Sequence, residues 1–192
     1  DEARFQIADV RFLTGDFEDA LDALKHLLSG RATNYVLNDA LELAALIESG
    51  RGDSVALKAY AVAVGLDRMG QRVHAVEALE GLLARTPPWE LRDRVMATMA
   101  GVLEASGRYT EVLQTWRRLI RETPRSPLCP LALIAQARVY EDRLGQFHEA
   151  FRVYDALMSE YPLSLEVDEA RVRLRTLKKR LREVESHSRE AG

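Results

Sequence analysis

A glycine followed by the same residue types at the same offsets occurs four times in this chain, and no other feature constrains its fold as strongly. Five residues after each glycine comes a small or short side chain, nine after it a large apolar one, and twelve after it a leucine. Self-similarity at a regular spacing is the sequence signature of a repeat architecture. The four glycines are Gly15, Gly70, Gly107 and Gly145.

Each copy of this pattern predicts a helix, a turn and a second, antiparallel helix. Glycine accepts the left-handed conformation that ends the first helix without a Cβ clash. The offsets of five, nine and twelve place the following apolar side chains on one face of the second helix. A proline seventeen residues after three of the glycines, at Pro87, Pro124 and Pro162, ends that helix. An all-α chain is therefore expected.

The turns resemble those of the tetratricopeptide repeat family. An aromatic residue follows the glycine by two positions in three copies, at Phe17, Tyr109 and Phe147, and alanine and the closing proline stand at the family's spacing. The resemblance covers nearly the whole chain and implies a right-handed α-α superhelical solenoid of about ten helices. The later glycines are spaced by 37 and 38 residues, and the fourth unit closes with Tyr161-Pro162. In both features the chain resembles bacterial variants of the family, which have a period near 37 and are common in cell-envelope assembly proteins.

The repeat is irregular near its first end. The spacing from Gly15 to Gly70 is 55 residues, which leaves room for one more helix. We expect Asn38 to cap this helix and Asp53 to cap the next one. A single solenoid domain over 1–192 is predicted, with units at 1–32, 53–87, 90–124 and 127–162, the extra helix at 35–50 and a capping helix at 165–187.

Two further departures concern the second half of the chain. Ala137, and not Arg138, fits the small position before Gly145, so the fourth unit has one extra residue ahead of its glycine. A fifth unit begins, but Arg182 stands where its glycine would fall on a period of 37. We therefore expect a final helix that caps the core with a polar outer face.

The final helix has a run of basic residues. We interpret the run as the solvated face of a helix whose apolar residues Ala170, Leu174, Leu177, Leu181 and Val184 pack inward. The alternative is a surface that binds an anionic membrane, a nucleic acid or an acidic partner. The basic residues are Arg171, Arg173, Arg175, Lys178, Lys179, Arg180 and Arg182.

Composition and motifs argue against catalysis. The net charge of −3 does not indicate a nucleic-acid partner. Cys129 is the only cysteine, which excludes an intramolecular disulfide, and we expect it to be a small buried residue. No metal-binding histidine spacing, nucleophile motif or phosphate loop occurs. We predict no enzymatic activity, no cofactor and no metal site.

The sequence does not decide the compartment. No apolar run approaches the roughly 18–20 residues of a membrane span. The chain begins at Asp1 within a helical pattern, so we expect an excised or processed product whose targeting segment, if any, lies upstream. Cytoplasmic and periplasmic or envelope-associated locations both stay open.

Two tryptophans and one tripeptide need an interpretation of their own. Trp116 holds a core offset and is expected to be buried, whereas Trp89 is either a packed residue at a helix start or a partly exposed contact. The tripeptide Arg51-Gly52-Asp53 is interpreted as a turn that ends in a helix cap, and not as an integrin motif.

The resemblance places ligand contacts on outward positions of the first helices, which line the concave surface in this family. Asp9, Val64, Gly101 and Val139 stand at a position where family members that clamp a C-terminal carboxylate have Asn or Lys. A groove for an extended or helical peptide is therefore favoured over such a clamp; a solvated surface with contacts elsewhere is the alternative. The candidate protein-binding residues are Asp9, Phe12, Tyr60, Asp67, Arg68, Arg94, Glu104 and Asp142.

Three functions are compatible with these features. The first is a non-catalytic interaction scaffold that binds a peptide or protein segment in this groove. The second is a structural or assembly component that acts through self-association or edge packing. The third is an accessory domain of a larger enzyme whose catalytic part lies upstream.

Overall fold

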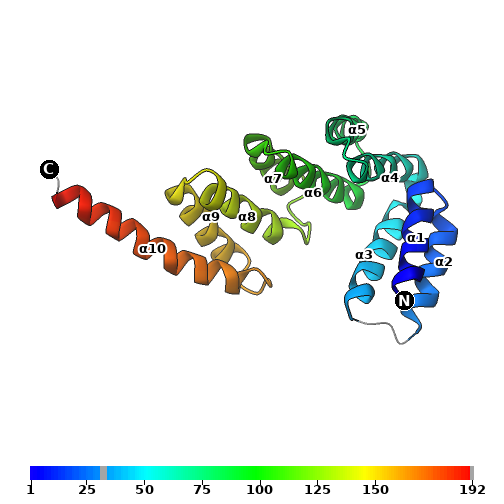
Figure 1. Cartoon of the computed structure of the whole chain (residues 1–192), viewed down its shortest axis with the longest axis horizontal. Helices are drawn as coiled ribbons and strands as arrows, with labels where there is room; N and C mark the ends of the chain where they lie inside the picture. Colours follow the sequence, from blue (N-terminus) through cyan, green and yellow to red (C-terminus); the bar gives the residue numbers. More distant parts are fainter. Residues whose placement is uncertain (31–33, 191–192) are drawn as a thin grey trace. The chain divides into compact units, whose positions relative to one another are not determined.

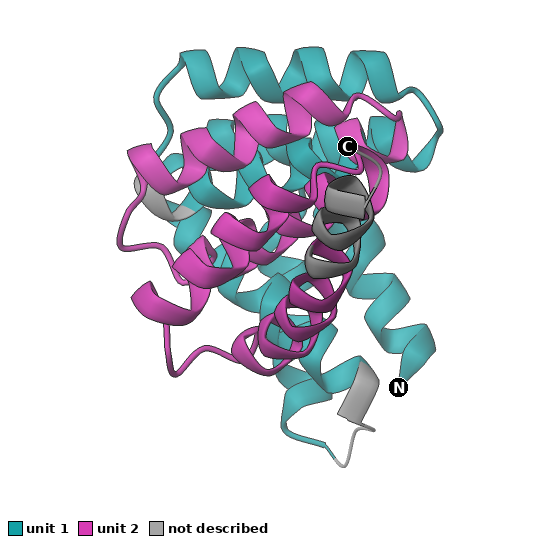
Figure 2. Cartoon of the chain, turned by 90° about the vertical axis from the view of Figure 1, so that its left-hand side faces the viewer, with its two compact units in different colours: residues 1–102 teal, residues 103–192 magenta. Residues whose placement is uncertain are grey.

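The structure is a computed structural model that describes residues 1–30 and 34–190, with the side chains of these residues except 34–35, 89–90 and 182–190. All regular elements in the described part are helical (Figure 1). The chain divides into two compact units, unit 1 from Asp1 to Val102 and unit 2 from Leu103 to Gly192 (Figure 2). The all-α fold class is confirmed. The prediction of a single solenoid domain over 1–192, with the repeat boundaries expected from the sequence, stays a prediction.

Unit 1 is built from helical hairpins and one additional helix. Helices α1 and α2 pack together, as do α4 and α5, and α3 packs against α1, α2 and α4. Their bounds are α1 Glu2–Thr14, α2 Phe17–Leu28, α3 Asn34–Gly50, the short 3₁₀ helix η1 Arg51–Asp53, α4 Ser54–Arg68, α5 Arg72–Ala84 and α6 Trp89–Ala105. The last three residues of α6 belong to unit 2.

Unit 2 continues the same construction. Helix α8 packs against α7 and α9, and α9 packs against the long helix α10. The bounds are α7 Tyr109–Glu122, α8 Cys129–Arg138, the π-helical turn η2 Val139–Arg143, α9 Phe147–Glu160 and α10 Val167–Glu190. Helix α10 continues past position 182, where the fifth glycine would have stood.

All four repeat glycines adopt the left-handed conformation that the sequence predicts. Their φ angles are +88° at Gly15, +76° at Gly70, +71° at Gly107 and +63° at Gly145. In the first three turns the residue after the glycine donates its N–H to the carbonyl five residues earlier, as from Asp16 to Arg11 at 2.8 Å. This bond closes a Schellman motif and satisfies carbonyls that the helix end leaves free.

The fourth turn differs by one residue. The Gln146 N–H donates to the carbonyl of Tyr140, six residues earlier, at 2.8 Å, and the Leu144 N–H donates to Val139 at 3.1 Å. These bonds close the π-helical turn η2. A π turn is the usual way for a helix to absorb a single inserted residue, so η2 accounts for the extra residue expected before Gly145.

The repeated apolar positions form the core of both units. The small residues five positions after the glycines, Ala20, Ala75, Val112 and Ala150, are all 0% exposed, which permits close approach of the paired helices. Trp116 and Cys129 are buried, as expected. Also buried are the residues at the other repeated offsets, namely Leu24, Leu27, Leu79, Leu82, Leu119, Tyr154 and Leu157.

One of the two predicted helix caps is wrong. Helix α3 begins at Asn34, so Asn38 lies inside the helix and does not cap it. Val36 and Leu37 are half-buried, and their packing extends the helix by one turn toward its N-terminus. Asp53, in contrast, accepts a hydrogen bond from the Ala56 N–H at 2.9 Å and caps α4, which confirms the interpretation of the Arg51-Gly52-Asp53 tripeptide as a turn.

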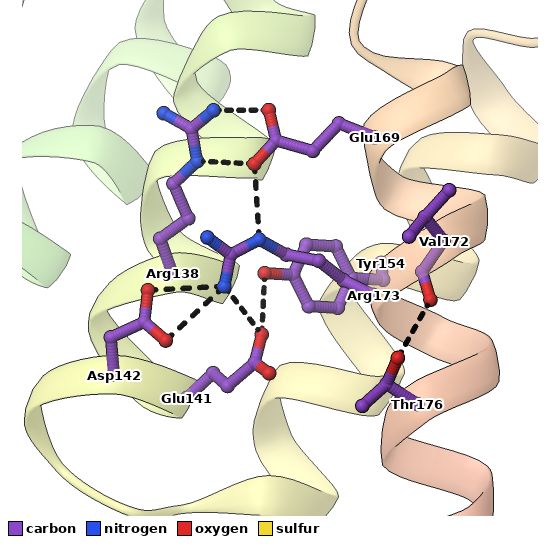
Figure 3. A network of polar contacts seen from close by, with 8 residues as sticks. All are labelled: Arg138, Glu141, Asp142, Tyr154, Glu169, Val172, Arg173 and Thr176. Carbon is purple, nitrogen blue, oxygen red and sulfur yellow. Dashed lines mark hydrogen bonds and ion pairs between the residues drawn. The ribbon is translucent and has the colours of Figure 1, made fainter.

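A polar network around Arg173 joins α10 to the preceding helices of unit 2 (Figure 3). The Arg173 guanidinium donates to Glu141 at 3.1 Å and to Glu169 at 3.0 Å. It also donates to both carboxylate oxygens of Asp142, each at 3.1 Å. Arg138 donates to Glu169 through two nitrogens, and Tyr154 donates to Glu141 at 2.9 Å. This network fixes the last helix on unit 2.

Other members of the basic run also have partners within unit 2. Arg171 pairs with Asp168 at 2.7 Å. The Lys178 ammonium lies 5.4 Å from the ring centroid of Phe151, and the Arg180 guanidinium lies 4.3 Å from that of Phe147. Ala170, Leu174 and Leu177 are buried beneath them. The side chains of Arg182 and Val184, like that of Trp89, lie outside the described residues.

Acid should weaken the attachment of α10. The hydrogen bond from Arg138 lowers the pKa of Glu169 below its ordinary value. The ionised Glu169 side chain therefore stabilises the folded state at pH values above its unfolded-state pKa, and this stabilisation is lost as the pH falls through the folded-state pKa. Glu169→Gln should therefore lower the melting temperature more at about pH 7 than at about pH 3, because the wild-type carboxylate takes up a proton as the pH falls toward and through its lowered pKa. An equal effect at both pH values, measured by circular dichroism, would contradict this.

Two glycines, one just before α5 and one inside it, provide a matched test of the turn. A Cβ added at either Gly70 or Gly81 would meet no atom within 4 Å, but only Gly70 has a positive φ. Gly70→Ala should lower the free energy of unfolding by about 1–2 kcal/mol. Gly81→Ala, inside the helix, should raise it by about 0.5–1 kcal/mol. Urea denaturation measures both, and the same sign for the two variants would disprove the explanation.

Candidate functional site

A hollow of about 220 Å³ lies in unit 1, between α1, α3, α4 and α6. Its walls combine apolar side chains, two aromatic rings and a set of charged groups. We refer to it as the unit 1 hollow; it is lined by Phe5, Asp9, Phe12, Asp39, Glu42, Leu43, Leu46, Tyr60, Val64, Arg68 and Arg94.

Two buried aromatic side chains contribute to the lining. Phe12 is 2% exposed and Tyr60 is 4% exposed, and their ring centroids lie 6.4 Å apart in a tilted arrangement. The Tyr60 hydroxyl shares a hydrogen bond of 2.6 Å with the Thr98 hydroxyl on α6. Burial raises the pKa of Tyr60, although this hydrogen bond acts in the opposite direction, so the phenol is neutral at physiological pH. The floor is therefore aromatic, uncharged and fixed in place.

The charged side chains form two pairs. Arg68 donates two hydrogen bonds to the Asp9 carboxylate, one of them 2.9 Å long. This pairing raises the pKa of the Arg68 guanidinium. Arg94 on α6 lies 3.5 Å from Glu42 on α3. Both arginines are partly exposed, so these pairs position the side chains and add little to stability.

Asp39 supplies a further carboxylate to the lining. It is exposed, and no ion pair involves it among the described residues. Three carboxylates and two guanidinium groups therefore line the hollow, and Asp39 is the group left without an opposite charge. A bound group that carries a positive charge would complete this arrangement.

The size of the hollow limits what it can hold. Pockets for small molecules and cofactors usually occupy roughly 300–1,000 Å³, which is larger than the 220 Å³ available here. An apolar cavity of about 150 Å³ is sufficient for one benzene ring. The unit 1 hollow thus fits one large apolar or aromatic side chain better than a complete cofactor.

Five of the candidate binding residues come together in the hollow, namely Asp9, Phe12, Tyr60, Arg68 and Arg94. Two of these, Phe12 and Tyr60, are core residues and were expected on an outward face of their helices. They are covered because α3 packs against both α1 and α4.

The other three candidates lie elsewhere. Asp67 is not part of the hollow and lies 3.8 Å from Arg72 at the start of α5. Glu104 and Asp142 belong to unit 2, and Asp142 is bound by Arg173 in the polar network (Figure 3). The selection of these residues as ligand contacts stays a prediction.

One wall of the hollow was not predicted from the sequence. Asp39, Glu42, Leu43 and Leu46 come from α3, the helix that interrupts the repeat, and Phe5 comes from the first turns of α1. The only sequence signal for this wall was the 55-residue spacing between Gly15 and Gly70. Offsets counted from the repeat glycines cannot predict the positions of residues in α3, because this helix is not part of the repeat.

Two other kinds of feature are absent from the described part of the chain. It contains no group of three or more His, Cys, Asp and Glu side chains placed to hold a metal ion. None of its helices combines the length and the apolar character needed to cross a bilayer.

Comparison with the sequences of known proteins gives two results. Residues 131–164, which include most of α8, η2 and α9, match the family model of the tetratricopeptide repeat. None of the curated proteins matches the chain significantly. The assignment to bacterial variants with a 37-residue period stays a prediction.

The fold is similar to that of two crystal structures of a kinesin light chain-type protein from Podosopora anserina, described as nearly identical TPR-like repeats. One, a single-substitution variant, has a TM-score of 0.53 and 16% identity, and the match covers 98% of this chain and 96% of that one. The other has a TM-score of 0.52 and 17% identity, with coverage of 97% and 95%. Residues 131–164 are therefore similar to a tetratricopeptide repeat, and the chain has a helical fold like that of solved tetratricopeptide-like repeat structures.

Proposed function

We propose that this chain is a non-catalytic protein-interaction scaffold and that the unit 1 hollow binds a segment of a partner protein. The observation on which the proposal depends is the combination of an aromatic floor, paired charges and the unpaired Asp39 carboxylate in one hollow. Folds of stacked helical repeats present rigid surfaces for such segments. A preformed surface lowers the entropy lost on binding.

The lining defines the chemistry of the bound segment. Leu43, Leu46 and Val64 offer apolar contacts, and the buried Phe12 and Tyr60 rings also line the hollow. We therefore expect the segment to insert one aromatic or large aliphatic side chain. Asp39 favours a lysine or arginine close to this anchor in the segment. An acidic segment would meet an excess of negative charge.

The pairs Arg68–Asp9 and Arg94–Glu42 have a separate role. Each pair joins two helices of the hollow, α4 to α1 and α6 to α3. They orient the four charged side chains, and their exposed polar atoms remain available to the backbone of a bound segment. This arrangement favours an extended or helical peptide over a second folded domain, which would need a larger surface.

Selection from a phage-displayed peptide library on the wild-type chain tests this function. Recovered peptides should share an aromatic or large aliphatic residue next to Lys or Arg. Val64→Phe, which fills the hollow, should weaken their binding at least about tenfold, because a lost anchor contact costs about 2 kcal/mol or more. Isothermal titration calorimetry with synthetic peptides measures the change.

The control is Val73→Phe. Val73 lies on α5, is 62% exposed and is not part of the hollow, so this variant adds the same bulk at a distant surface and should bind normally. Peptides that bind Val64→Phe as tightly as the wild type would place the binding surface elsewhere.

Charge reversal tests the electrostatic part separately. Asp39→Lys should weaken the same peptides severalfold, and the loss should shrink as salt is added, because the interaction is exposed and screened. Asp22→Lys is a matched control, since Asp22 is another exposed carboxylate of unit 1 outside the hollow. A selection that returns acidic peptides, or an Asp39→Lys variant with undiminished affinity, would contradict the assignment.

A further inference from the structure

A second depression in unit 1, of about 750 Å³, shares no residue with the unit 1 hollow. It runs between the turn at Gly15–Phe17, α4 and α5. We call it the α4–α5 groove. Its lining residues from α4, α5 and the residue that follows α5 are Ser54, Val55, Lys58, Ala59, Val62, Ala78, Gly81, Leu82 and Arg85.

The groove exposes apolar surface that the core does not use. Val55 and Val62 are 57% and 50% exposed, and with Ala59 they follow one another at helical spacing on α4. The opposite wall on α5 contains the small residues Ala78 and Gly81, which leave room for bulky side chains from outside. An exposed apolar strip with such space is a binding surface for apolar side chains.

The charges at the groove have one sign. Lys58 and Arg85 line it, and the lining contains no carboxylate. Neither cation has an ion pair with any residue that the structure describes. An occupant of this groove should therefore combine exposed large apolar side chains with carboxylates on either side of them.

The loop between α9 and α10 has this chemistry. Leu163 and Leu165 are 97% and 96% exposed, the two most exposed large apolar residues in the described part of the chain. Glu160 and Glu166 flank them, and neither carboxylate forms an ion pair among the described residues. The N–H of Ser164 donates to the Tyr161 carbonyl at 3.0 Å and that of Val167 to the Ser164 carbonyl at 3.3 Å, so the loop is ordered by its own backbone.

We propose that the Leu163–Leu165 loop of one copy of this chain binds in the α4–α5 groove of a second copy. The leucines cover Val55 and Val62, and Glu160 and Glu166 approach Lys58 and Arg85. This self-association is independent of peptide binding in the unit 1 hollow. The loop and the groove are different surfaces, so the contact is heterologous, and copies add head to tail. Two leucines and two ion pairs form a small interface, so association is weak and depends on concentration.

Sedimentation velocity over a roughly hundredfold concentration range tests the proposal. The wild-type chain should shift from monomer to larger species. The loop variant, Leu163→Ser with Leu165→Ser, and the groove variant, Gly81→Phe, should both stay monomeric. A Cβ at Gly81 meets no atom within 4 Å, so the new ring enters the groove without disturbing the core.

Mixing the two variants gives the sharpest result. The loop variant retains a groove and the groove variant retains a loop, so an equimolar mixture should form a heterodimer that grows no further. Val172→Ser and Val73→Phe are matched controls, since both residues are 62% exposed and lie outside the loop and the groove. Both controls should associate like the wild type.

Charge exchange tests the ion pairs. Lys58→Glu with Arg85→Glu should abolish association, and mixing that protein with Glu160→Lys plus Glu166→Lys should restore it. Arg125→Glu, at an exposed arginine of unit 2, should have no effect. A wild-type chain that stays monomeric throughout, a loop variant that associates normally, or a mixture of the loop and groove variants that remains monomeric would each overturn the proposal.

Discussion

The left-handed glycine that ends the first helix of each hairpin is the constraint on which the rest of the structure depends. At +63° to +88°, these φ angles reverse the chain within two residues and bring the small residue five positions later against the preceding helix. An L-residue with a Cβ would pay a steric penalty at each of the four turns. Because each hairpin buries only one face, stacking of neighbouring hairpins supplies the remaining core.

The candidate site arises where this regularity is interrupted. Helix α3 does not belong to a glycine-anchored hairpin, yet it packs against α1, α2 and α4. It contributes Asp39, Glu42, Leu43 and Leu46 to a hollow whose other walls come from first helices of the repeats. The inserted helix thus adds a wall to the surface of these first helices, and together they form an open hollow with an aromatic floor. In unit 2 the irregularity is smaller, and a π turn absorbs it.

The sequence was sufficient to predict the helical hairpins but not the candidate site, and the reason is physical. Offsets from a glycine follow from local backbone geometry, so the burial of Ala20, Ala75 and Ala150 could be predicted. Whether an outward residue such as Phe12 is covered depends on α3, whose packing the offsets do not describe. The same holds for ion pairs between distant residues: Arg68 and Asp9 are 59 positions apart, and Arg173 engages Asp142 across 31. Asn38 shows that a capping residue type alone does not fix a helix start.

The proposed function requires that the hollow made by α3 with the repeat helices accepts a side chain from a partner segment. Methyl NMR of the chain with a selected peptide that contains an isotope-labelled aromatic residue tests this requirement. We expect nuclear Overhauser effects from that ring to the methyl groups of Leu43, Leu46 and Val64, with none to Val55 or Val62 of the α4–α5 groove. Contacts from the ring to Val55 and Val62, or to unit 2, with the methyl groups of the hollow unperturbed, would contradict it.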